Sequence, residues 1–350
     1  MVYLTHSVAT DRGGMELMGR DLMTFLQETF DVTIVSGDRS RTVPQGVSAV
    51  RVPLPARPAV ARIWLYRLLA PMLSYRARRQ SQLVYSNGAV TTVRCDVTTV
   101  HLCHAVAQRE ATSATRAARW ARLAALRLEQ HQMRGGAGEL VAVSRSVRDQ
   151  LSAEYGHTAV VINNGVDLRV TRERQERGEG PLRCILVTHD FAAKGISIAI
   201  DALALASHVT LTVVGSGDSS SFHAIATQRG VAERITFLGA LPGGDIPYHE
   251  HDVVLSLSGY ESFGLTMVEG AAQGCVVVAT DTGVAGDFVN SGAGVVVTRE
   301  PRDLVRAWSL VSEPSTWHEM SQRARQVAQQ FDRSTMHGAY VELFNKVAAR

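Results

Sequence analysis

Hydrophobic and polar positions change along the chain between the two-residue period of a strand and the longer period of an amphipathic helix. Residues 2–6 read as a buried strand, residues 15–30 have helical spacing, and residues 32–36 are strand-like again. Gly13 and Gly14 interrupt the pattern after the first strand. A strand, a helix and a second strand in this order predict a parallel sheet with helices on both faces.

The rest of the chain repeats this alternation. In the first half, strands are expected at 83–85, 97–101, 140–143 and 159–162, with an arginine-rich helical stretch at 105–134. In the second half, strands are expected at 184–188, 209–214, 235–237, 253–257 and 276–279, with helices at 196–206, 221–230 and 266–273. The intervening residues 169–181 are nearly all polar and are interpreted as a linker.

The predicted fold class is therefore α/β, with two doubly wound parallel-sheet, Rossmann-like domains facing a cleft. We place the domains at 1–168 and 182–331, and expect a last helix within 332–350 to cross back to the first domain. Ligands of open α/β sheets bind beyond the carboxyl ends of the strands. Functional side chains are accordingly expected in the loops that follow strands.

Composition fits a folded chain of this size. With 45% hydrophobic and 20% charged residues among 350, the chain can bury two ordinary cores. We find no apolar run that suits a membrane span or a secretory signal, and the four cysteines lack paired spacing, so a cytoplasmic protein is expected. A metal site at Cys95, His101, Cys103 and His104 is an alternative, but the spacing matches no standard zinc pattern, and no metal is expected.

Charge is unevenly distributed between the two halves. Residues 1–180 hold 24 Arg against 16 acidic residues, a net charge of +8, whereas residues 181–350 have a net charge of −5. A basic half is compatible with an anionic membrane surface, with nucleic acid or with a solubilising surface alone. Because no nucleic-acid-binding motif accompanies the charge, no nucleic acid partner is expected.

The densest chemical signal lies at 258–270. Glu261 follows a predicted strand and Glu269 lies in the next helix, so both carboxylates can face one pocket. Between them, Phe263, Gly264 and Leu265 bring backbone amides to a helix amino terminus, an arrangement suited to an anion. The alternative interpretation is that Glu261 only caps the helix and Glu269 lies on its solvated face.

Three further positions stand at the ends of predicted strands. Lys194 is one of only two lysines, against 34 arginines, and an ammonium group is a compact binder of phosphate. His101 and His104 follow the strand at 97–101, where they are either structural or part of a site at the sheet edge.

Taken together, these motifs resemble the retaining glycosyltransferases of family 4, which have the GT-B fold. The similarity rests on the 258–270 motif and on the order of Gly13-Gly14-x-Glu16, Asn164-Gly165, Lys194-Gly195 and Val214-Gly215 along nearly the whole chain. The Asp190-Phe191-x-x-Lys194-Gly195 stretch is similar to the branch of glucosyltransferases that act on the lipopolysaccharide core.

The resemblance implies an activity: transfer of a hexose from a UDP- or GDP-linked sugar to a hydroxyl acceptor, with the nucleotide sugar as substrate and no cofactor. It also implies roles. Glu261 and His101 would lie near the donor sugar, Lys194 at its diphosphate and Glu269 at the ribose. The backbone at Gly13, Gly14, Gly215 and 263–265 would complete the donor site, and His104 and Glu16 would lie on the acceptor side.

The chain departs from the family at one phosphate contact. The family usually has an Arg a few residues before the Lys, whereas here His189-Asp190-Phe191 occupies that stretch. Arg12, beside Gly13, is our first candidate for the replacing cation, because a loop after the first strand reaches the predicted cleft.

Rival functions share parts of this pattern. A GT-B nucleotide-sugar epimerase or a non-catalytic nucleotide-sugar-binding protein would need the same donor site. A nicotinamide oxidoreductase would need a glycine-rich fingerprint after the first strand, which residues 8–14 lack. A serine hydrolase would need a Gly-x-Ser-x-Gly elbow, and the sequence has none.

Residues 57–80 combine six arginines with bulky apolar and aromatic residues. Such a segment fits peripheral contact with an anionic membrane. The alternative is a buried helix whose arginines reach the surface, with Pro71 breaking any single long helix. On the first interpretation the acceptor is an envelope glycan or lipid-linked, and on the second it is a soluble small molecule.

Overall fold

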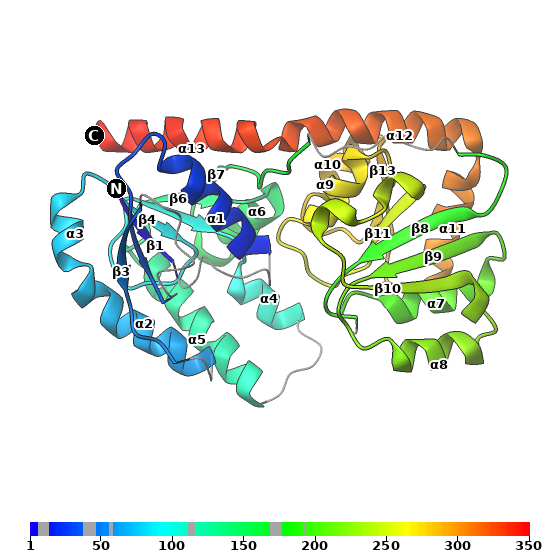
Figure 1. Ribbon diagram of the computed structural model, residues 1–350, viewed down its shortest axis with the longest axis horizontal. Coiled ribbons are helices and arrows are strands. Elements are labelled where there is room, and N and C mark those ends of the chain that lie inside the picture. The colour runs from blue at the N-terminus through cyan, green and yellow to red at the C-terminus, as the bar shows by residue number, and fades with distance from the viewer. Residues whose placement is uncertain (6–13, 38–46, 56–58, 111–115, 169–176, 192) are drawn as a thin grey trace. The chain divides into compact units, whose positions relative to one another are not determined.

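The computed structural model describes residues 1–5, 14–37, 47–55, 59–110, 116–168, 177–191 and 193–350. It divides into two compact units, the first formed by Met1–Gly165 with Ser334–Arg350 and the second by Val166–Arg333. Most of the linker expected at 169–181 lies outside the described residues. Each unit has its own sheet, and Figure 1 labels the elements of both.

The first unit contains a seven-stranded sheet in the order β3-β2-β1-β4-β5-β6-β7, and every neighbouring pair is parallel. Its strands are β1 (Val2–Leu4), β2 (Thr33–Ser36), β3 (Ser48–Arg51), β4 (Val84–Asn87), β5 (Val97–Val100), β6 (Glu139–Ala142) and β7 (Val160–Val161). Its helices are α1 (Gly14–Leu26), α2 (Ala59–Leu73), α3 (Tyr75–Gln80), α4 (His104–Glu110), α5 (Arg116–Met133), α6 (Arg145–Tyr155) and α13 (Arg333–Ala348), the last of which belongs to this unit from Ser334 onward.

The second unit contains a six-stranded, all-parallel sheet in the order β10-β9-β8-β11-β12-β13. Its strands are β8 (Leu182–Val187), β9 (Val209–Val214), β10 (Ile235–Gly239), β11 (Val253–Ser256), β12 (Val276–Ala279) and β13 (Gly294–Val296). Its α-helices are α7 (Ile196–Leu205), α8 (Ser220–Gln228), α9 (Leu265–Ala272), α10 (Ala285–Asn290), α11 (Pro301–Ser312) and α12 (Pro314–Ala328). The strand order reverses between β8 and β11, which makes their carboxyl ends a topological switch point.

Helix α13 completes the core of the first unit although it is remote from it in sequence. Met336, Tyr340 and Phe344 are buried in the same hydrophobic cluster as Tyr85 of β4. The Phe344 and Tyr85 rings meet edge to face with centroids 5.1 Å apart, a favoured aromatic geometry. Tyr340 is also tied to β5, because its hydroxyl lies 2.8 Å from Thr99 Oγ1.

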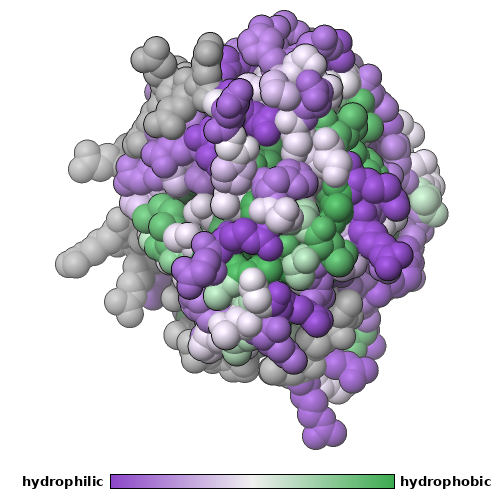
Figure 2. Space-filling model, turned by 90° about the vertical axis from the view of Figure 1, so that its right-hand side faces the viewer, coloured by the Kyte–Doolittle hydropathy of each residue, from purple (hydrophilic) through white to green (hydrophobic). Residues whose placement is uncertain are grey.

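The core of the second unit is built from strands that are apolar on both faces. Val253 and Leu255 of β11 point to one face and Val254 to the other, and all three are at most 2% exposed. Residues 276–278 of β12 are likewise fully buried, as expected for a parallel sheet covered by helices on both sides. The surface of this unit is more polar than its core. The face of this unit seen in Figure 2 carries its apolar residues in small groups separated by hydrophilic ones.

The two-sheet α/β prediction is confirmed by this architecture. The strands predicted at 209–214 and 276–279 have those bounds in the structure. As expected, no single long helix runs through this segment, because α2 ends at Leu73 and α3 begins at Tyr75, although Pro71 itself lies inside α2. Proline leaves the carbonyl four residues earlier without its helical donor, and the Thr92 hydroxyl donates to that carbonyl, of Arg67, at 3.5 Å.

Candidate functional site

The loops after β8 and β11 bring two predicted site residues together at the switch point of the second sheet. The Lys194 ammonium donates to Glu261 Oε1 in an ion pair. The side chains retain 29% and 22% of their exposure, so the pair is shielded but reachable by a ligand. Lys194 and Glu261 are 67 residues apart in sequence, and only the parallel topology makes them neighbours.

The loop that carries Lys194 is held by its own backbone and by a glycine. The Lys194 amide donates to the Asp190 carbonyl at 3.2 Å, and the Ala193 amide donates to Asp190 Oδ1 at 3.1 Å. Gly195 has φ of 79°, and a Cβ at this position would lie 2.6 Å from the Cβ of Leu257, just after β11. The Lys-Gly sequence therefore lets the two loops pack directly against each other.

Glu261 is oriented by a second hydrogen bond. The Ser258 hydroxyl donates to Glu261 Oε1 at 3.0 Å, the same oxygen that accepts from Lys194. Among the described residues, no hydrogen bond to Oε2 is found. This oxygen can therefore accept a hydrogen bond from a ligand while Oε1 keeps both of its partners.

The 263–265 backbone forms the start of α9, as predicted. Gly264 is the N-cap residue with φ of 94° and offers no side-chain cap, so the first amides of the helix are free of a local side-chain acceptor. Phe263 is only 2% exposed and packs against Phe331, so its ring anchors the loop and only its backbone can face a ligand.

Glu269 lies within α9 with its carboxyl group directed at Tyr248. The Tyr248 hydroxyl donates to Glu269 Oε2 at 2.9 Å. Burial raises the pKa of Glu269, and the Tyr248 hydrogen bond partly offsets that rise. Glu269 is half-buried and its carboxyl group is bound by Tyr248, which argues against the alternative of a fully solvated helix face.

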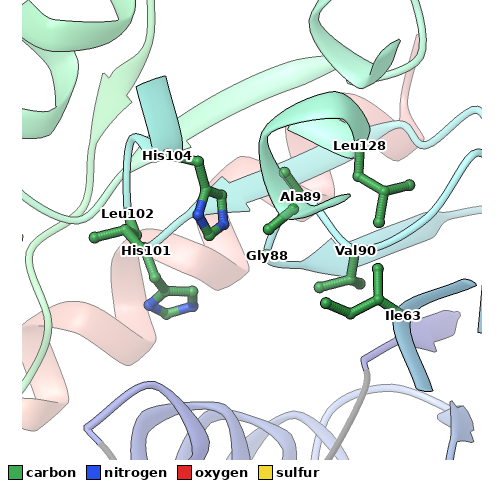
Figure 3. Close-up of a pocket in the computed structure, with 9 residues that line it drawn as sticks. Ile63, Gly88, Ala89, Val90, His101, Leu102, His104 and Leu128 are labelled. Atoms are coloured by element: carbon green, nitrogen blue, oxygen red, sulfur yellow. The ribbon is translucent and has the colours of Figure 1, made fainter. Parts of the chain in front are cut away.

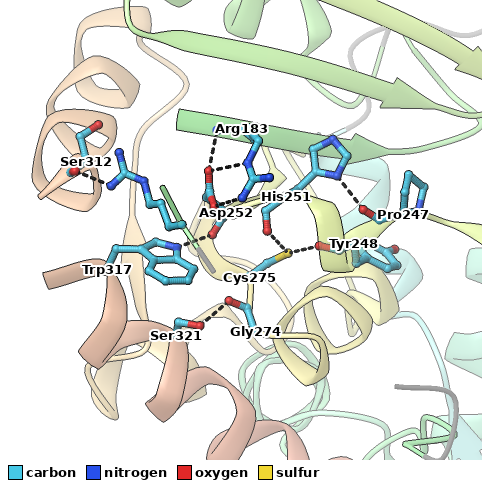
Figure 4. A network of polar contacts seen from close by, with 11 residues as sticks. Arg183, Pro247, Tyr248, His251, Asp252, Gly274, Cys275, Ser312, Trp317 and Ser321 are labelled. Carbon is cyan, nitrogen blue, oxygen red and sulfur yellow. Dashed lines mark hydrogen bonds and ion pairs between the residues drawn. The ribbon is translucent and has the colours of Figure 1, made fainter. Parts of the chain in front are cut away.

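A polar network fixes Tyr248 in place (Figure 4). The buried thiol of Cys275 donates to the carbonyls of Tyr248 and His251 at 3.2 and 3.3 Å. The following residue, Asp252, is fully buried and binds Arg183 through both carboxylate oxygens. The Tyr248 partner of Glu269 thus belongs to a network that joins residues at β8, β11 and β12.

The loop after β9 contributes Gly215 through a close backbone approach. Gly215 has φ of 150°, and a Cβ there would lie 1.6 Å from the Thr188 carbonyl oxygen after β8. Gly217 lies against the Phe191 ring in the same way, at 2.4 Å. These contacts explain the glycines structurally, and a role for Gly215 at the donor stays a prediction.

The replacing cation proposed from sequence, Arg12, lies outside the described residues together with Gly13. Gly14 begins α1, and the side chain of Glu16 is also outside the described part. A cation that the sequence analysis missed is Arg299, after β13. Its exposed side chain folds over the loop that precedes Glu261, with Nη1 3.2 Å from where a Cβ on Gly259 would lie.

In the first unit, His101 stands at the carboxyl end of β5 and is buried. Its Nε2 lies 2.8 Å from Oδ1 of Asn87, at the end of β4. Burial lowers the pKa of His101 to about 4, so the ring is neutral near pH 7. Since an amide oxygen only accepts, Nε2 carries the proton and Nδ1 is left as a hydrogen-bond acceptor.

His104 is the first residue of α4 and is positioned by a carboxylate that the sequence analysis did not single out. The backbone amides of His104 and Ala105 donate to the two oxygens of fully buried Glu129 at 2.8 and 3.2 Å. The Tyr155 hydroxyl donates to the same carboxylate at 2.7 Å. Burial lowers the pKa of His104, and the nearby Glu129 opposes that shift.

Both histidines line a pocket of about 190 Å³ in the first unit (Figure 3). The remaining lining residues come from α2, α5 and the loops after β4 and β5, and they are Ile63, Gly88, Ala89, Val90, Leu102, Ala125 and Leu128. Among the described residues, those of the pocket included, no group of three or more His, Cys, Asp or Glu is arranged to hold a metal ion. None of the described helices combines the length and apolarity needed to cross a membrane.

Two family profiles match consecutive parts of the chain. The profile described as Glycosyltransferase Family 4 matches residues 12–170, and that described as Glycosyl transferases group 1 matches residues 169–330. The two matches meet close to the boundary between the structural units.

Individual relatives of known function match only part of this chain. A glycogen synthase of Mycobacterium tuberculosis is 27% identical over 59% of this chain and 53% of its own. A phosphatidyl-myo-inositol mannosyltransferase of the same species is 31% identical over 48% of this chain and 47% of its own. A lipopolysaccharide core biosynthesis mannosyltransferase of Rhizobium leguminosarum is 29% identical over 47% of this chain and 52% of its own. Each match thus spans about half of the relative's length.

Solved structures share the fold over almost the whole chain. The lipopolysaccharide glycosyltransferase WaaG superposes with a TM-score of 0.75 at 16% identity, covering 98% of both chains. The sucrose-phosphate synthase of Thermosynechococcus elongatus superposes with a TM-score of 0.79 at 17% identity, covering 99% and 98%. At these identities the likeness establishes the GT-B fold.

The His101 environment leads to a prediction about its protonation. We expect ¹⁵N NMR of the histidine rings to show His101 as the neutral Nε2–H form from pH 5.5 to 8. The unfolded chain takes up this proton near pH 6.5 and the folded one near pH 4, so the contribution of His101 to stability falls as the pH drops through that window. A ring that becomes cationic above pH 6 would contradict the assignment, and the Asn87→Ala variant should lose the fixed tautomer.

Proposed function

Because this chain belongs to family 4 of the glycosyltransferases and has the GT-B fold, we propose that it moves a hexose-type sugar from a UDP- or GDP-linked donor to a hydroxyl acceptor with retention of configuration. The observation that carries this proposal is the pairing of Lys194 with Glu261 at the switch point of the second sheet. A cation and a carboxylate side by side match a donor with a diphosphate next to a sugar. A solved structural neighbour from Anabaena is described in complex with UDP-glucose.

The reaction breaks the bond between the anomeric carbon and a phosphate oxygen, so negative charge grows on the diphosphate. At an effective dielectric near 20, an ammonium about 4 Å away is worth roughly 4 kcal/mol. A helix amino terminus typically contributes about 0.3 to 1 kcal/mol. Lys194 is therefore the principal stabiliser in this proposal, and the start of α9 assists it.

In the proposed transfer the acceptor oxygen attacks from the face that the phosphate leaves, and the leaving phosphate takes the acceptor's proton. No enzymic nucleophile is required. Glu261 Oε2 accepts a hydrogen bond from a hydroxyl of the donor sugar. A role for His101 Nδ1 at the sugar stays a prediction. Glu269 binds ribose hydroxyls through Oε1, since Tyr248 occupies Oε2.

The acceptor is proposed to be presented at a membrane. Trp64, Leu68, Met72 and Leu73 of α2 and Tyr75 of α3 are between 44% and 70% exposed, which argues against a wholly buried α2. The Arg67 and Arg79 guanidinium groups lie 5.1 and 5.7 Å from the ring centroids of Trp64 and Tyr75. Aromatic, apolar and cationic groups in one exposed segment suit an anionic interface. Arg57 lies outside the described residues.

A panel of nucleotide sugars screened by thermal shift tests the donor site. The true donor at about 100 times its Kd should stabilise the chain by about 2.7 kcal/mol. With that donor, Lys194→Ala should lower turnover about 100- to 1000-fold, as expected for loss of one preorganised electrostatic group. The control is Lys346→Ala on α13, which removes the other lysine from an exposed position and should leave turnover unchanged.

Near-normal turnover of Lys194→Ala at saturating donor would contradict this role. Product analysis with and without an acceptor separates the alternatives. An epimerase converts the nucleotide sugar without an acceptor, and a non-catalytic binding protein leaves it unchanged.

The two glutamates should affect different kinetic constants. Glu261→Ala should mainly lower kcat, because Glu261 contacts the sugar as its ring becomes cationic. Glu269→Ala should mainly raise the KM for the donor, because Glu269 binds the unreacting ribose. Steady-state kinetics measures both, with circular dichroism to check folding. Equal effects of both variants on both constants would contradict the assignment.

Membrane contact is tested by cosedimentation with anionic vesicles at low and high salt. Binding is expected at low salt and should weaken with salt, because each arginine near the surface contributes about 1 kcal/mol. The Leu68→Ser/Met72→Ser variant should bind less than wild type, whereas Leu205→Ser/Leu310→Ser, at exposed apolar positions of the second unit, should not change binding. Absence of binding at low salt would favour a soluble acceptor.

A further inference from the structure

The pocket beside His101 and His104 has a chemical character that the proposed transfer does not explain. Of its nine lining residues, seven are apolar or glycine and the other two are the histidines. They come from α2, α4, α5, the loop after β4 and the loop after β5, so five separate segments enclose one apolar space (Figure 3). A site for bare sugar would be expected to present more hydrogen-bonding groups.

The pocket is also uncharged. No Asp, Glu, Lys or Arg is among its described lining residues. Burial lowers the pKa of both His101 and His104, so both rings are neutral near pH 7. A charged or strongly hydrated group would lose its water here without gaining an opposite charge. The occupant that complements this pocket is therefore neutral and apolar.

The volume of the pocket limits the size of its occupant. The volume is about 190 Å³, and an apolar protein cavity of about 150 Å³ is large enough for benzene. The pocket thus suits an aromatic ring or an alkyl chain of roughly six to eight carbons. Each methylene group transferred from water into such a site tightens binding about fourfold.

His104 gives the pocket a polar end. Its backbone is fixed by Glu129, and its imidazole ring points into the space among the lining residues. No hydrogen bond from this ring to the described residues is found. A neutral imidazole has one donor and one acceptor nitrogen, so it can bind a hydroxyl group attached to the apolar occupant.

We propose that this pocket binds an uncharged apolar group of the acceptor, the size of an aromatic ring or a short alkyl chain, with His104 hydrogen-bonded to a neighbouring hydroxyl. This inference rests on the proposed function, because only a transferase has an acceptor. The acceptor would then be recognised by its apolar aglycone as well as by the hydroxyl that receives the sugar.

The test measures binding directly, so it does not depend on catalysis. Methyl, hexyl and octyl β-D-glucopyranosides are titrated into the full chain below their micellar concentrations, with isothermal titration calorimetry as readout. Affinity should rise at least tenfold from the methyl to the octyl probe. Ala125→Phe, which fills the pocket from α5, should abolish this rise, whereas Leu126→Phe, the next residue and outside the lining set, should keep it.

Val90→Phe, from the loop after β4, is a second variant that fills the pocket, in case Ala125→Phe does not fold. Thermal unfolding shows whether each variant is folded. Equal affinity for all three probes, or an alkyl preference that survives both filling variants, would overturn the pocket assignment. Failure of the proposed function looks different: the octyl probe would bind in the pocket, yet no nucleotide sugar would stabilise the chain or be turned over.

Discussion

The candidate donor site depends on the close packing of two loops at the switch point of the second sheet. The loop after β8 and the loop after β11 approach each other where Gly195 meets Leu257, at a separation that a side chain on residue 195 would prevent. This contact places the Lys194 ammonium on Glu261. An ammonium has three donors, so Lys194 can bind a diphosphate while it stays paired with Glu261, and the ion pair holds the cation in position for a donor.

The surroundings of this pair are arranged to limit its freedom. Ser258 shares the carboxylate oxygen with Lys194, and the Asp190 side chain and carbonyl hold the loop from the other side. Glu269 is fixed separately, through Tyr248 and the Cys275 thiol. The two carboxylates of one short motif thus have independent supports, which is compatible with the different roles that the family resemblance implies.

Sequence reasoning predicted the features that depend on local pattern. The strands at 209–214 and 276–279 are continuous runs with a strong β-forming composition. Lys194, Glu261 and Glu269 lie in short motifs that can be identified from their neighbours in the sequence. Asn87, Glu129, Tyr248 and Arg299 were missed because each acts across a long sequence separation. Glu129, for example, reaches the start of α4 from 25 residues away. The carbonyl that Pro71 leaves without a helical donor likewise meets a tertiary partner, Thr92, which the local pattern does not reveal.

In the proposed function, Lys194 makes the carboxyl edge of the second sheet a diphosphate site. The most direct measurement is isothermal titration calorimetry of UDP against UMP, and of GDP against GMP, with the full chain and with Lys194→Ala. For the preferred base, we expect the diphosphate to bind about tenfold or more tightly than the monophosphate, a difference of about 1.4 kcal/mol or more. We also expect the variant to lose most of this preference. Equal binding of the two nucleotides to wild type, or an undiminished preference in Lys194→Ala, would contradict it.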